Sequence, residues 1–138
     1  MTWELMAFDP AAVPCSTYED VAEWKNRAMH DPSYRGEESE RANNFYLDLS
    51  EKFPAFNPDE ADEEELDAMI EASDEVLLYD DLFVDYVADA DYVYGWFGYG
   101  LAEKVEAFAR EKAKELGLAY FDVNECTITM PDGSVLKK

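Results

Sequence analysis

Residues 82–97 read LFVDYVADADYVYGWF, and this stretch decides the fold. Its two halves, residues 82–87 and 92–97, are rich in β-branched and aromatic side chains, which favour strands. Between them lies Ala88-Asp89-Ala90-Asp91, whose length suits a four-residue hairpin loop. The sequence therefore predicts an antiparallel hairpin in the second half of the chain.

Helical and strand patterns follow this hairpin. Residues 101–116 carry apolar side chains at intervals of three and four, which predicts an amphipathic helix, and Gly117 is a suitable C-cap. Strands are predicted at residues 118–123 and 126–130. A final short strand at residues 135–136 would fold back onto the preceding one after a turn.

The segment before the hairpin predicts a strand and two helices. Residues 2–8 are predicted to form a buried strand that stops at Asp9-Pro10. Ser16 and Glu19 have the spacing of a capping box and predict the start of a helix. A second helix is predicted at residues 38–52, where Pro54 lies just beyond its end.

The predicted order is strand, helix, helix, strand, strand, helix, strand, strand, which indicates an α+β class. A length of 138 residues favours one domain covering residues 1–138. We expect an antiparallel sheet with the helices on one face. If the first two helices form one crossover, the order becomes the split βαβ of ferredoxin-like folds. The acidic residues 55–81 are left open as either helix or loop.

The charge balance excludes some classes of partner. The chain has 33 acidic and 11 basic residues, a net charge of −22, together with 48% apolar residues. Binding to nucleic acid requires cations that neutralise phosphates, and an anionic membrane would repel this chain. No apolar run approaches 18 residues and the N-terminus does not read as a signal peptide, so we expect a cytoplasmic protein.

The acidic residues are concentrated in one region. Residues 53–102 contain 15 acids and no Lys or Arg, whereas the remainder of the chain is mixed in sign. A negative surface of this kind accelerates association with a cationic partner. Tyr and Trp beside the acids would suit a binding hot spot. The predicted partner-binding residues are Asp59, Glu60, Asp62, Glu63, Glu64, Glu65, Asp67, Asp80, Asp81, Asp89, Asp91, Tyr92, Tyr94 and Trp96.

Two other interpretations of the same residues stay open, and a third, a calcium loop, fits the sequence poorly. The acids could form a solvated face that serves only solubility. The aromatic residues could be core rather than surface. A calcium loop starting at Asp89 would need an acid at its fifth position, a Gly at its sixth and a Glu at its twelfth, but Val93, Tyr94 and Gly100 stand there. We therefore predict neither a metal site nor a cofactor.

Catalytic signals are sparse. Asp9, Asp85 and Asp122 interrupt or follow apolar runs, and a pair of such carboxylates could perform acid–base chemistry. We expect them to have structural or exposed roles, with Asp85 and Asp122 on the outer sheet face. The single histidine, His30, is expected at a helix end. The two cysteines are expected to be free thiols, and we predict no catalytic residues.

Short motifs spread along the chain carry a resemblance. They are Trp3-x-Leu5-x-x-Phe8-Asp9-Pro10, Phe53-Pro54 and Tyr120-Phe121-Asp122-Val123. Together they resemble a group of small acidic bacterial proteins, some of which are immunity proteins of polymorphic or contact-dependent toxins. The resemblance implies a cytoplasmic inhibitor that binds one toxin domain and blocks its active site.

The functional prediction combines the charge with this resemblance. It is an acidic inhibitor that covers the active site of a basic, nuclease-type toxin, with no direct contact to nucleic acid or membrane. The alternatives are a small structural or regulatory domain whose charge serves solubility and, third, a carboxylate-based enzyme. The oligomeric state is left open.

Overall fold

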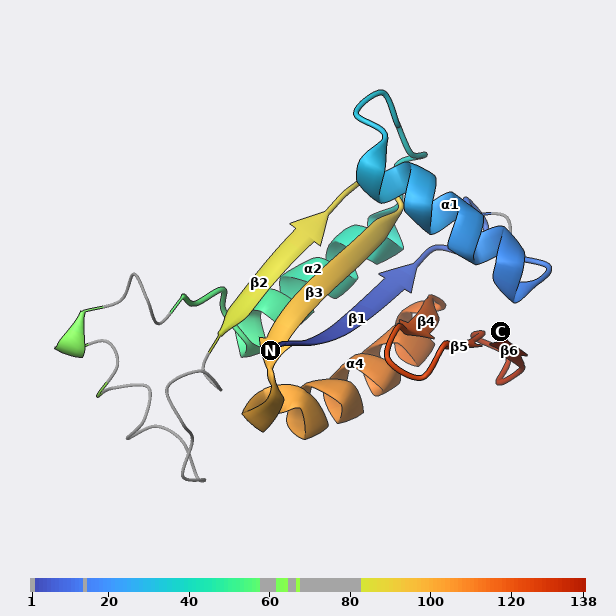
Figure 1. The fold of residues 1–138 in the computed structure, drawn as a ribbon. Coiled ribbons are helices and arrows are strands. Elements are labelled where there is room, and N and C mark those ends of the chain that lie inside the picture. Colours follow the sequence, from blue (N-terminus) through green and yellow to red (C-terminus); the bar gives the residue numbers. More distant parts are fainter. Residues whose placement is uncertain (1, 14, 58–61, 65–66, 68–82) are drawn as a thin grey trace.

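The computed structural model describes residues 2–13, 15–57, 62–64, 67 and 83–138 (Figure 1). Within these ranges the chain forms one six-stranded sheet with helices packed against it. The elements are β1 (Thr2–Phe8), α1 (Tyr18–His30), α2 (Glu40–Lys52), β2 (Val84–Ala88), β3 (Tyr92–Gly98), the 3₁₀ turn η2 (Tyr99–Leu101), α4 (Ala102–Leu116), β4 (Ala119–Asp122), β5 (Thr127–Thr129) and β6 (Val135–Lys137). The predicted α+β class is confirmed.

The sheet has the order β2-β3-β1-β4-β5-β6, and each neighbouring pair is antiparallel. In β1, Leu5 pairs with Gly95 of β3, while Met6 pairs with Phe121 of β4. Because β3 is antiparallel to both β1 and β2, those two strands run parallel with β3 between them. This is the connectivity of a split βαβ unit. The ferredoxin-like assignment stays a prediction, because α1 and the β5–β6 hairpin are additions to that unit.

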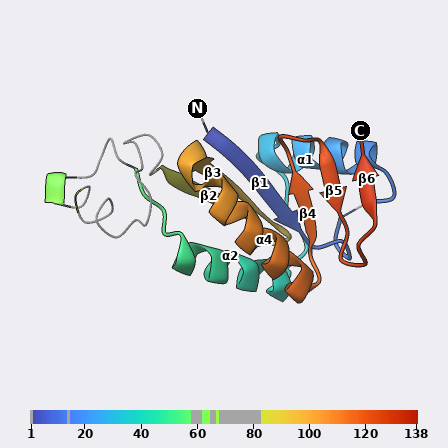
Figure 2. The ribbon, with the colours of Figure 1, turned by 90° about the horizontal axis from the view of Figure 1, so that it is seen from below.

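The helices cover both faces of the sheet, so the prediction of helices on one face is wrong (Figure 2). Leu5 and Ala7 of β1 belong to the apolar cluster beneath α2 and α4. Met6 and Phe8 point the opposite way and pack in a second cluster beneath α1. Since successive side chains of a strand alternate between faces, the uniformly apolar residues 5–8 of β1 need cover on both sides.

Phe97 lies at the centre of the aromatic packing on the α2–α4 face. Its ring centroid is 6.2 Å from that of Trp3 and 5.6 Å from that of Tyr86. A Cβ atom on Gly95 would lie 2.6 Å from the Phe97 ring, so glycine is required there for close packing. Gly95 does not have a positive φ, so glycine is needed here for space and not for a left-handed backbone conformation.

The helix boundaries follow local capping chemistry. α1 begins one residue later than expected, because Thr17 rather than Ser16 is the N-cap and Asp20 completes the capping box. His30 is the last residue of α1, as predicted, and α4 ends at Gly117, which adopts φ 75°. Among the described residues, no helix combines the length and apolar character needed to cross a bilayer.

The connection between α1 and α2 crosses the end of the sheet where β1 stops and the β2–β3 loop turns. The Ser39 amide donates to the Ala90 carbonyl at 2.8 Å, and the Asp9 amide donates to the Asp91 carbonyl at 3.0 Å. Three segments that are distant in sequence are therefore fixed against one another, and this end of the sheet carries the site described next.

Candidate functional site

An acidic hollow lies between the N-terminus of α2 and the β2–β3 loop. It has a volume of about 760 Å³ and is lined by Glu38, Ser39, Glu40, Asn43, Asp89 and Ala90. The carboxylates of Glu38, Glu40 and Asp89 are exposed, whereas Ser39 is buried beneath them. We call this group of six residues the acidic hollow.

The carboxylates of the acidic hollow lack counter-cations within the described part of the chain. None of Glu38, Glu40 and Asp89 forms an ion pair there, while five other ion pairs join Arg or Lys to acids elsewhere. The first turn of a helix favours acids, so Glu40 also stabilises the start of α2. That role does not account for Glu38 or Asp89, which lie in loops.

The β2–β3 loop also holds a buried carboxyl group, that of Asp91, next in sequence to Ala90 of the acidic hollow. It is 1% exposed, and its Oδ2 accepts a hydrogen bond from the Tyr34 hydroxyl. Tyr34 in turn accepts a bond of 2.8 Å from the indole Nε1 of Trp24. The other oxygen, Oδ1, has no partner among the described residues. Burial raises the pKa of Asp91, against the opposing effect of the Tyr34 bond.

Gly36 allows the connector to close over Asp91. A Cβ atom at position 36 would lie 2.5 Å from Cγ and Oδ1 of Asp91, so only glycine fits there without displacement. The connector and the Asp91 carboxyl group are thus packed directly against each other. Asp91 is a structural anchor of the sheet end and is not available to a partner at the surface, which corrects its predicted role as a binding residue.

A second buried carboxylate, Asp9, joins the end of β1 to the start of α2. It accepts hydrogen bonds from the Ser39 hydroxyl at 2.7 Å, the Arg41 guanidinium at 2.6 Å and the Ala11 amide at 2.9 Å. Burial acts to raise the pKa of Asp9, but these bonds and the Arg41 charge together lower it. Its acceptor positions are therefore used to fix the floor of the acidic hollow.

Apart from the buried Asp91, the predicted acidic residues fall into two groups. Asp62, Glu63, Glu64, Asp67 and Asp89 are described and exposed. The others lie outside the described residues; they are Asp59, Glu60, Glu65, Asp80 and Asp81. Most of residues 55–81, for which the sequence left helix and loop open, also lie outside the described residues.

The predicted aromatic anchors are mainly core residues. Tyr92 and Tyr94 are 2% and 3% exposed and belong to the cluster beneath α1. The Tyr92 ring packs edge-on against Trp24 of α1, with 5.6 Å between centroids. Trp96 is half-buried against the same cluster. Tyr92 and Tyr94 are therefore not surface anchors, because α1 covers the sheet face that the sequence left unassigned.

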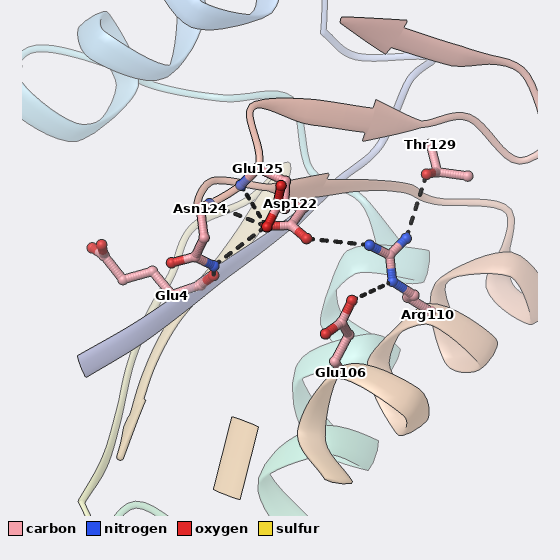
Figure 3. Close-up of polar contacts among 7 residues, drawn as sticks. All are labelled: Glu4, Glu106, Arg110, Asp122, Asn124, Glu125 and Thr129. Atoms are coloured by element: carbon pink, nitrogen blue, oxygen red, sulfur yellow. Dashed lines mark hydrogen bonds and ion pairs between the residues drawn. The ribbon is translucent and has the colours of Figure 1, made fainter. Parts of the chain in front are cut away.

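The carboxylates considered for catalysis are not brought together. Asp9 and Asp122 lie beyond opposite ends of the β1–β4 pairing, and Asp85 is exposed on β2. Asp122 is buried and faces α4, contrary to the expected outer position. Its Oδ2 is 3.3 Å from the Arg110 guanidinium, while its Oδ1 accepts from the Asn124 and Glu125 amides (Figure 3). Asp122 therefore closes the β4–β5 turn onto α4.

Metal-binding groups and cysteines give no further site. No cluster of three or more His, Cys, Asp or Glu side chains suited to a metal ion occurs among the described residues. Cys15 and Cys126 are both free, as predicted, and each is half-buried. Cys126 adopts a φ of 55° in the β4–β5 turn.

Sequence reasoning missed Glu38 and Glu40 as members of the site. They lie about fifty positions before Asp89, outside the stretch that lacks Lys and Arg. The only local signal was the helix start predicted at residue 38. The sheet topology unites these residues, because the α1–α2 connector crosses the end of β3.

Comparison of the chain with protein-family models, with curated proteins and with solved structures finds no match. The function is therefore argued from the geometry and charge of the described residues.

Proposed function

We propose that this chain is an acidic binding protein that neutralises a basic partner, and specifically an immunity protein that covers the active site of a nuclease-type toxin. The acidic hollow is the observation that carries the proposal. It presents three exposed carboxylates on a concave surface, and a Lys or Arg side chain of a partner is its natural complement.

The distribution of charge supports a directed surface over a merely solubilising one. Residues 53–102 carry 15 acids and no Lys or Arg, while residues 104–138 carry six acids and six bases. A surface that served solubility alone would mix signs throughout. The hollow borders the strongly acidic region, since Asp89 lies in both.

A nuclease partner follows from the chemistry of its substrate. An enzyme that binds a polyphosphate backbone exposes a groove lined with Lys and Arg. An acidic protein placed over this groove pairs with the same cations and excludes the nucleic acid. Complementary charge also accelerates the encounter, which suits an inhibitor that must act before its toxin does. The proposed location is the cytoplasm, where a nuclease meets its substrate.

The proposal predicts that an adjoining reading frame encodes a large protein with a basic C-terminal domain, and the test uses that domain. Nuclease activity and binding of that domain are measured with the wild-type chain and with the triple variant Glu38→Lys, Glu40→Lys, Asp89→Lys. We expect the wild-type chain to abolish cleavage at a stoichiometric ratio. The triple variant should bind at least about tenfold more weakly, because each reversal places a like charge against the partner's cations.

The matched control is the triple variant Glu19→Lys, Glu103→Lys, Glu125→Lys. These acids are also exposed, and Glu103 occupies a first helical turn as Glu40 does. Both variants change the net charge equally. A loss of affinity seen only in the Glu38, Glu40, Asp89 variant therefore assigns binding to the acidic hollow. Equal binding by both variants would refute the hollow as the contact site. An adjoining domain that does not bind the wild-type chain would refute the proposed function itself.

A further inference from the structure

A second cavity lies between the C-terminal part of α4 and the β4–β5 strand pair. Its volume is about 220 Å³. Its apolar wall consists of Ala113 and Leu118 at the end of α4, together with Met130 and Pro131 after β5. The cavity is smaller than the pockets that bind drug-sized molecules, so it suits a compact ligand.

The polar groups around this cavity are hydrogen-bond donors. Tyr120 lines the cavity, and its hydroxyl is buried with no hydrogen-bond partner in the described part of the chain. Such a group is costly to bury unless it is satisfied, and therefore its position calls for an acceptor from outside the chain. Thr129, which pairs with Tyr120 across the strands, contributes a second hydroxyl.

Two cations complete the cavity. The Arg110 guanidinium stacks over the Tyr120 ring at 4.5 Å from its centroid and contacts Glu106, Asp122 and Thr129. Figure 3 shows these three contacts holding the guanidinium in place between α4 and the sheet. They use three of its five N–H groups, which leaves two as donors. Lys114 lines the cavity from the next turn of α4 and is exposed.

Two capping bonds at the end of α4 reduce the repulsion that a helix C-terminus exerts on an anion. The Gly117 and Leu118 amides cap the carbonyls of Lys114 and Ala113. The surrounding sequence is also neutral, in contrast to the rest of this acidic chain, because residues 104–138 contain equal numbers of acids and bases. An anion is therefore repelled less by this part of the chain than by residues 53–102, which have no Lys or Arg.

We propose that this cavity binds a small carboxylic acid with a compact aliphatic or aromatic body. The apolar wall takes the body, while the Tyr120 hydroxyl, Arg110 and Lys114 donate to the carboxylate. This site is independent of the acidic hollow and of the proposed toxin partner. Its ligand class follows from the combination of an unsatisfied donor, a guanidinium held in place, a nearby exposed ammonium and an apolar wall.

The probes are phenylacetate and hexanoate, each titrated to about 10 mM into the ¹⁵N-labelled full chain at about 0.15 M salt. We expect saturable shifts of amide resonances in residues 110–120 and 129–133. Phenylacetamide, which has the same body without the charge, should bind at least about fivefold more weakly. Tyr120→Phe and Lys114→Gln should each weaken phenylacetate binding by about three- to tenfold.

Matched controls are Tyr99→Phe and Lys25→Gln, which remove a hydroxyl and a cation away from the cavity. Both should leave phenylacetate binding unchanged. Absence of saturable shifts in residues 110–120 and 129–133 with either acid would overturn the proposal. So would equal affinity for phenylacetate and phenylacetamide, or unaltered binding by both Tyr120→Phe and Lys114→Gln when their spectra show a native fold.

Discussion

Asp91 is the residue at which burial and charge conflict most clearly. Burial raises the pKa of Asp91 above the usual range of an aspartate, the neighbouring charges of Asp89 and Asp9 act in the same direction, and the Tyr34 hydrogen bond opposes them. The folded chain therefore holds a proton at Asp91 more readily than the unfolded chain does. The corresponding stabilisation is complete below the unfolded pKa and is lost as pH rises through the folded pKa.

Asp91→Asn should remove this contribution to pH dependence. The free energy of unfolding of the wild type, minus that of the variant, should decrease with pH from about 4 upward, because only the wild type has the group that ionises. Urea unfolding at several pH values between about 4 and 8 measures both curves. Asp9, whose pKa is lowered, titrates in both proteins, so its opposite effect largely cancels in the difference. Parallel curves would show that Asp91 ionises as readily in the folded chain as in the unfolded one.

A substitution at Gly95 tests the close packing around Phe97. Gly95→Ala would place a methyl group 2.6 Å from the Phe97 ring, which is fully buried and held by Trp3 and Tyr86. We expect a loss of about 1–3 kcal/mol in the free energy of unfolding, measured by urea titration.

A double-variant cycle isolates that contact. In a Phe97→Leu background the ring is absent, so the added methyl group should cost less than it does in the wild type. The same cost in both backgrounds would locate the strain elsewhere in β3.

At the scale of the element, only one of two neighbouring hydroxyl residues, Ser16 and Thr17, caps the start of α1. Thr17 accepts from the Asp20 amide at 3.2 Å, and the Thr17 amide donates to the Asp20 carboxylate. Thr17→Ala should therefore reduce the free energy of unfolding by about 1 kcal/mol. Ser16→Ala is the matched control and should change it by less than about 0.5 kcal/mol. A larger effect at Ser16 would move the helix start to the position first predicted from the sequence.

The elements that sequence predicts best are those with strong local periodicity. The hairpin strands and the helix ending at Gly117 were placed to within two residues, because alternation, apolar spacing and a C-cap are all local signals. The face that each helix covers is not a local property. The sequence alone allows Tyr92 and Tyr94 to be exposed, whereas in the structure α1 covers them. The acidic hollow was missed for the same reason, since Glu38 and Asp89 meet only through the topology.

At the scale of the whole molecule, the net charge of −22 acts on stability as well as on binding. Like charges repel most strongly in the compact state, and salt screens them over a Debye length of about 10 Å at 0.1 M. We therefore expect the midpoint of thermal unfolding to rise between about 10 and 500 mM salt. Circular dichroism in NaCl and in KCl measures it, and the two salts should act alike. A midpoint that falls with salt would mean that attractive pairs dominate.

The segregation of charge gives the molecule two different surfaces. In our proposal the acidic hollow receives a cationic partner, whereas the cavity at Tyr120 is lined by residues from the stretch 104–138, which carries equal numbers of acids and bases. The two sites can be tested separately, because no residue lines both.

The decisive measurement is the rate at which the chain associates with the basic domain that we expect the adjoining reading frame to encode. Stopped-flow measurements compare the wild type, the Glu38, Glu40, Asp89 reversal variant and the Glu19, Glu103, Glu125 control at about 50 and 300 mM salt. We expect fast, strongly salt-dependent association for the wild type and the control. The reversal variant should associate at least about tenfold more slowly at low salt and depend less on salt. Identical rates and salt dependence for both variants would contradict the claim that the acidic hollow receives the partner.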